Sequence, residues 1–206
     1  MSPLRRCLFV LSLCSLPVIA YAPSAEACAC CSEPGQRVES VGKLEGYEKG
    51  EIEKLRFGKK ARLYMTAAGA QGVLGVQGVA DTTDAYELTQ RRAGDTWTLS
   101  FKDGKGRTGT LAFTLPTHIE SFFVDPQDGK AGTDPVLYKE WRINASVATT
   151  GIFASAAAPG APMIRLVLQG RGNSCTSVDQ FTSFTLIVSG PSARFTFFGA
   201  LASPGI

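Results

Sequence analysis

Thr96-Trp97-Thr98-Leu99-Ser100-Phe101 is the stretch that decides the fold of this chain. Its three large apolar residues alternate with three hydroxyl-bearing residues, which is the period of a strand with one buried face. The alternation returns in Thr108-Gly109-Thr110-Leu111-Ala112-Phe113-Thr114-Leu115. Between the two lies Asp103-Gly104-Lys105-Gly106-Arg107, whose glycines supply the positive φ of a hairpin loop. Together these segments predict an antiparallel hairpin.

The same alternation recurs through most of the chain after about residue 60. No segment of useful length shows a helical period, and only Glu51–Arg56 is suited to a short helix. Crossover helices are therefore absent, and neighbouring strands should be antiparallel. Further strands are predicted at 61–66, 73–79, 85–91, 119–124, 141–147, 164–169, 184–188 and 194–197.

These patterns predict an all-β domain over residues 61–206, with about ten antiparallel strands in a meander. A single up-and-down barrel is the preferred architecture, because short hairpin loops dominate and closure removes exposed edges. A two-sheet β-sandwich remains the alternative, since an alternating pattern does not show which strands pair.

The N-terminal residues have the composition of an export signal. Arg5 and Arg6 precede an apolar run from Cys7 to Tyr21, and Ala25-Glu26-Ala27 follows as a small-x-small cleavage site. Residues 1–27 are therefore expected to be a cleaved signal peptide, and the mature protein to be periplasmic or extracellular. No transmembrane segment is expected after cleavage. Residues 28–60 are predicted to form a Cys-rich segment of irregular structure.

The charge of the chain excludes some partners. Removing residues 1–27 lowers the formal charge from +3 to +2, which gives no electrostatic case for nucleic acid or an anionic membrane. Basic residues are densest at 54–60 and at Arg91-Arg92. Either group could form a small anion-binding patch, but a solvated strand end or turn is the preferred interpretation.

Four cysteines remain after cleavage: Cys28, Cys30, Cys31 and Cys175. In an oxidising compartment, the preferred interpretation is a disulfide from Cys175 to one N-terminal cysteine. The alternative is a Cu or Zn site at Cys28, Cys30 and Cys31, since closely spaced thiolates bind soft metals. The C-x-C-C spacing differs from the C-x-x-C of common zinc sites, so no cofactor is the first expectation. A lipid anchor on Cys28 is disfavoured, because Ala25 stands where lipoprotein signals carry a large aliphatic residue.

Three residues outside the cysteines are candidates for ligand binding. Arg171 and Asn173, in the turn-rich stretch before Cys175, could present a guanidinium fork to a carboxylate or phosphate, although a tight turn explains them as well. His118 is the single histidine, and no G-x-S-x-G elbow accompanies it. A surface role at a strand start is therefore preferred over a catalytic one.

Three functions are open at this stage. The leading hypothesis is an exported, non-enzymatic β-domain that binds a small ligand or a partner protein, because no catalytic set is assembled in the sequence. The second is a thiol or metal protein that uses the cysteine cluster. The third, ranked lowest, is a hydrolase-type enzyme.

Overall fold

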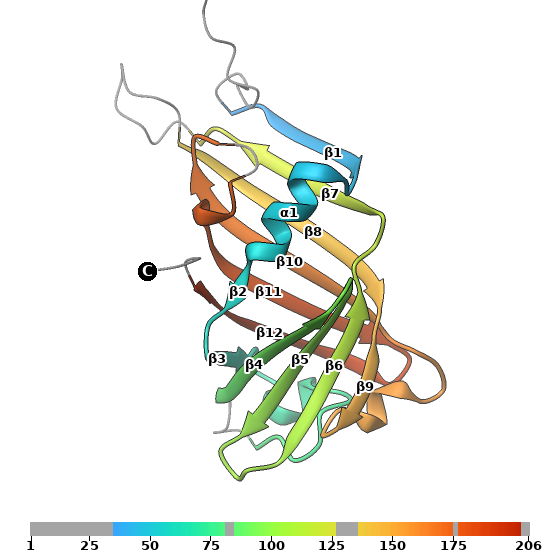
Figure 1. Cartoon of the computed structure of the whole chain (residues 1–206). Helices are drawn as coiled ribbons and strands as arrows, with labels where there is room; N and C mark the ends of the chain where they lie inside the picture. Colours follow the sequence, from blue (N-terminus) through green and yellow to red (C-terminus); the bar gives the residue numbers. More distant parts are fainter. Residues whose placement is uncertain (1–34, 81–84, 127–135, 175–176, 203–206) are drawn as a thin grey trace, which may run out of the picture.

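The computed structural model describes residues 35–80, 85–126, 136–174 and 177–202, and these form twelve β-strands with one α-helix (Figure 1). Every strand pair is antiparallel, so the all-β, antiparallel prediction is confirmed. The strands are β1 (Arg37–Lys43), β2 (Arg56–Phe57), β3 (Lys60–Leu63), β4 (Ala85–Ala93), β5 (Thr96–Asp103), β6 (Thr108–Thr114), β7 (His118–Val124), β8 (Leu137–Ser146), β9 (Ala148–Gly151), β10 (Met163–Gly172), β11 (Phe181–Gly190) and β12 (Ala193–Ala202).

The strands belong to one sheet, in the order β1-β7-β8-β10-β11-β12-β3-β4-β5-β6-β9, with β2 paired to β12. The sheet is not closed, because β1 and β9 are its two ends. However, β9 follows β8 after the single residue Val147 and pairs with β6. The part of the sheet that runs from β8 through β10 to β6 therefore curls round, so that its last strand, β9, is the segment that directly follows β8 in the chain. The lower half of Figure 1 shows this curl.

The hairpin that the sequence indicates most strongly is present as β5 and β6. Asp103, which is buried, closes its loop by accepting hydrogen bonds from the backbone N–H groups of Lys105 and Arg107, each at 2.9 Å. Its second oxygen accepts from Arg107 Nε at 2.7 Å. Arg107 in turn donates to the carbonyl oxygen of Gly78 at 2.7 Å, so the hairpin loop also holds a distant segment of the chain.

Two predictions about local structure are wrong. The segment 73–79 is not a strand: it follows the 3-10 turn η1 (Gly69–Gly72), and only Leu74 forms an isolated bridge, to Arg194. Its regularly spaced glycines permit turns, as the positive φ of Gly75 and Gly78 shows. The described part of 28–60 is regular and not irregular, since it holds β1, a helix and β2. β1 lacks the alternation that would reveal it, because nearly all its residues are exposed at the sheet edge.

The helix α1 (Gly46–Lys54) begins five residues before the predicted start and ends two residues before the predicted end. It buries Ile52 completely, and Glu51 almost completely, against the sheet. In Figure 1 it lies across the sheet in front of β7, β8 and β10. Within the four described ranges, no helix is long and apolar enough to cross a membrane.

Aromatic rings fill the space around which the sheet curls. Phe101 and Phe197 are almost fully buried, with ring centroids 4.5 Å apart. Phe153 completes the cluster, with its ring centroid 5.3 Å from that of Phe101 and 5.9 Å from that of Phe197. Such contacts stabilise by roughly 0.5–1.5 kcal/mol each beyond the burial of area. Because this centre is a packed core, a ligand site has to lie at the rim or on the surface.

Candidate functional site

His118 lies at the first position of β7 and is exposed. Its Nδ1 contacts the hydroxyl oxygen of Thr117, the preceding residue, at 3.0 Å. Among the described residues, no carboxylate or further hydroxyl group is hydrogen-bonded to the ring. The nucleophile, base and orienting acid of a triad are therefore not assembled around this histidine.

Arg171 lies near the end of β10 and Asn173 directly after it, and both are exposed. Asn173 Oδ1 accepts a hydrogen bond from Gln180 Nε2 at 3.3 Å, so this amide helps to close the loop that runs from 173 to 180. These two residues are neighbours, as predicted. Their use as a ligand site stays a prediction.

The structure does not bring His118 to this loop. Across the sheet, Arg171 is opposite Tyr138, and Tyr138 is opposite Val124. His118 precedes Val124 by six positions on β7. At about 3.3 Å per residue, roughly 20 Å along the strand separates the histidine from the level of Arg171. The three predicted ligand-binding residues therefore do not share one site.

Cys28, Cys30, Cys31 and Cys175 all lie outside the described residues. The disulfide, metal and lipid-anchor hypotheses that depend on them stay predictions. In the part of the chain that the structure does describe, no group of three or more potential ligand side chains is placed to hold a metal ion.

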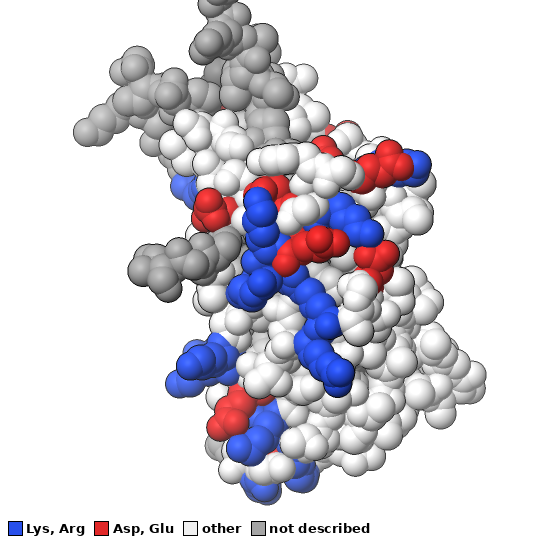
Figure 2. Space-filling view, viewed as in Figure 1, with Lys and Arg blue, Asp and Glu red and all other residues white. Residues whose placement is uncertain are grey.

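A cleft of about 670 Å³ lies between α1 and the end of β4. Figure 2 shows positive and negative side chains crowded on the face that carries α1. We call the cleft itself the α1–β4 cleft. It is lined by Lys49, Glu53, Arg56, Gln90, Arg92, Gly94 and Asp95. Its volume is in the range of small-molecule sites, about 300–1,000 Å³. Three cations face two carboxylates, so the lining carries net positive charge.

The arginines of the α1–β4 cleft converge on the C-terminal end of α1. Arg56 Nη1 donates to the carbonyl oxygens of Glu53 at 3.0 Å and Leu55 at 2.9 Å. Arg92 donates to the same two oxygens. Carbonyl groups at a helix C-terminus lack partners within the helix and attract cations, which explains why both side chains gather there.

Arg92 is the most perturbed group of the cleft. Its guanidinium carbon lies 4.1 Å from the centroid of the Trp97 ring, which shields it from water on one side. Burial, followed by repulsion from Arg56, lowers the pKa of Arg92 to about 10. At the rim, Lys49 Nζ lies 2.8 Å from Asp95 Oδ1, and this hydrogen bond raises the pKa of Lys49. The cleft therefore holds two guanidinium groups close together at a site that is partly shielded from solvent.

A second unusual group is Lys139 on β8, a residue that is 3% exposed. Its Nζ donates to the carbonyl oxygen of Ser174 and, at 2.6 Å, to Gln180 Oε1. Burial lowers the pKa of Lys139 to about 8. This lysine fixes the loop that contains Asn173, and it lines a separate cavity beneath α1.

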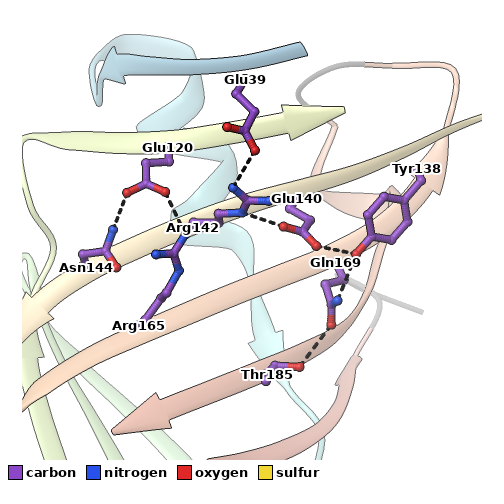
Figure 3. A network of polar contacts seen from close by, with 9 residues as sticks. All are labelled: Glu39, Glu120, Tyr138, Glu140, Arg142, Asn144, Arg165, Gln169 and Thr185. Atoms are coloured by element: carbon purple, nitrogen blue, oxygen red, sulfur yellow. Dashed lines mark hydrogen bonds and ion pairs between the residues drawn. The ribbon is translucent and has the colours of Figure 1, made fainter. Parts of the chain in front are cut away.

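The opposite face of the sheet carries a network of polar side chains (Figure 3). Glu120 accepts from Asn144 at 2.8 Å and from Arg165 at 2.9 Å, while Arg142 Nε donates to Glu140 at 2.6 Å. These donors and acceptors pair with one another across β7, β8 and β10. The network therefore holds the strands in register and is not the site we favour. Its remaining members are Glu39, Tyr138, Gln169 and Thr185.

Sequence reasoning missed Lys139 as a functional candidate, and it named Arg91-Arg92 only as a possible anion patch while preferring a solvated turn. A signal for both residues exists. Alternation from Tyr86 and Leu88, both buried, places Arg92 on the same inward face of β4. Alternation backward from Trp141 places Lys139 on the apolar face of β8. A charged residue at an inward position of a strand is the signal that could have identified both.

In comparisons with known proteins, the chain matches no family model, no curated protein and no solved structure.

Proposed function

We propose that this protein is a non-enzymatic binding protein that takes a small anionic ligand, a carboxylate or a phosphate, in the α1–β4 cleft. The observation that carries the proposal is the pair Arg56 and Arg92, held at one end of a cleft of about 670 Å³. An anion placed there would relieve the repulsion that lowers the pKa of Arg92.

The place of action that we propose is outside the cytoplasm. It follows from the export signal predicted for residues 1–27, and it makes the mature protein periplasmic or extracellular. A ligand-binding β-domain in such a compartment needs no resident cofactor for this role.

The test is a calorimetric titration of the protein with inorganic phosphate, citrate and succinate at low salt, with glucose as the neutral comparison. We expect one anion to bind at a single site, with an affinity that falls as salt is added. Arg56→Gln and Lys49→Gln should each weaken binding, about tenfold for the arginine, which corresponds to about 1.4 kcal/mol. Arg92 is left intact, because it also anchors α1.

Lys102→Gln is the matched control. Lys102 forms an exposed ion pair with Glu87 at 3.1 Å on the neighbouring strand, outside the cleft. Its replacement removes the same charge from a position outside the cleft and should leave binding unchanged. Equal losses in Lys102→Gln and Arg56→Gln would reduce the effect to net charge, and no binding of any anion would remove the proposal.

A further inference from the structure

Lys139 is a buried amine that has no counter-charge among the described residues. Its Nζ is hydrogen-bonded to two neutral oxygens, one from the backbone of Ser174 and one from the amide of Gln180. The ring centroid of Phe181 lies 5.1 Å from the same atom. A charged amine in these surroundings has lost most of its hydration, so the neutral form is favoured more than at the surface.

Charged groups do stand on the elements around Lys139, but none forms an ion pair with it in the described ranges. α1 contributes Glu48 and Glu51, and the Oε2 atom of Glu51 accepts from Val178 N at 2.9 Å. β1 contributes Lys43, which is paired with Glu45. The 3-10 turn η3 (Val178–Gln180) contributes Asp179, which is exposed.

The lysine also lines a cavity of about 190 Å³ between α1, β1, β7 and β8. We call this the α1–β7 cavity; its polar lining consists of Ser40, Lys43, Glu48, Ser121, Lys139 and Glu140, and the Glu140 carboxylate is paired with Arg142. Its volume is that of roughly six water molecules, at about 30 Å³ each. It therefore suits a molecule of a few heavy atoms and is smaller than the α1–β4 cleft.

We propose that Lys139 is a reactive amine that forms an imine with a small aldehyde or ketone admitted to the α1–β7 cavity. Lysines that become nucleophilic in proteins are those desolvated in an apolar site. In the reaction, the neutral amine nitrogen attacks the carbonyl carbon, and a proton moves from nitrogen to oxygen to give a carbinolamine. Loss of that oxygen as water forms the C=N bond. One water leaves for each imine, and no oxidant or reductant takes part.

The test is to expose the full-length protein to acetaldehyde at pH 7.5 with cyanoborohydride, which reduces any imine to a stable amine. Peptide mass spectrometry then gives the rate of alkylation at each lysine. Lowering the pKa of Lys139 to about 8 raises its neutral fraction by about two orders of magnitude, and its lower basicity offsets part of that gain. We expect Lys139 to react roughly tenfold faster than the exposed Lys102.

The same measurement in concentrated urea separates intrinsic reactivity from the effect of the fold. Unfolding should abolish the advantage of Lys139 over Lys102, because the advantage comes from burial. Lys139→Arg should remove the fast site and leave the other lysines unchanged. The inference is overturned when folded protein alkylates Lys139 no faster than Lys102.

Discussion

Replacement of Lys139 by Met gives the sharpest test of the energetics of this fold. Methionine has a similar length and no charge, so the variant keeps most of the packing on β8 and removes a proton-binding site. In the folded protein, burial lowers the pKa of Lys139 from 10.5 to about 8. At about 1.4 kcal/mol for each pKa unit, keeping this lysine protonated in the folded state costs about 3 kcal/mol.

The sign of the pH effect follows from proton binding. Between pH 8 and pH 10.5 the unfolded chain holds a proton on Lys139 that the folded protein has lost, so stability rises with pH in this window. Integrating between pH 7 and pH 9.5 gives a gain of roughly 2 kcal/mol in the free energy of unfolding of the natural protein relative to Lys139→Met. Below pH 7 the difference between the two proteins should be constant.

The assay is equilibrium unfolding in urea, an uncharged denaturant, at pH 7, 8, 9 and 9.5, followed by far-UV circular dichroism. Every other group titrates in both proteins, so its contribution cancels in the difference. Lys102→Met, at an exposed position, is the control for the loss of a lysine side chain. Parallel stability curves for the natural protein and Lys139→Met would refute the reasoning, because they would mean that the buried amine keeps its ordinary pKa.

Three further perturbations test other parts of the structure. Asp103→Asn should destabilise by roughly 2–4 kcal/mol in urea unfolding, since it removes the ionic partner of the Arg107 guanidinium. Burial opposes the charged form of Asp103, but hydrogen bonds from the loop outweigh it and lower the pKa of Asp103. Its stabilising contribution should therefore be lost as the pH falls from about 4 through this lowered pKa. Gly151→Ala should lower the melting temperature by several degrees, because Gly151 has φ of +58° and an added Cβ would meet the carbonyl oxygen of Thr108 at 2.1 Å; an unchanged melting temperature would contradict this. Glu51→Ala should lower the free energy of unfolding by about 1–3 kcal/mol, and Glu51→Gln should lower it less, because the glutamine amide oxygen can still accept from Val178 N. Hydrogen exchange at the Val178 amide should become faster in the alanine variant alone.

The candidate site shows which of its residues could be predicted from the sequence and which could not. Dense basic groups at 54–60 and at Arg91-Arg92 are visible in the sequence, and each is a plausible anion patch or a plausible solvated turn. The structure adds what the sequence does not show: Arg56 and Arg92 donate to the same two carbonyl oxygens at the end of α1. No spacing rule relates Arg56, two residues after the end of α1, to Arg92, which lies on a strand 36 positions later.

The sequence by itself determined the all-β class, the antiparallel pairing and the hairpin of β5 and β6. These follow from a period of two and from turn residues, which are local properties that survive without knowledge of the neighbours. The tertiary structure decided that the sheet stays open, that β9 continues β8 to pair with β6, and that Lys139 loses its water. Strand order and desolvation depend on contacts between segments far apart in the chain, so no local pattern encodes them.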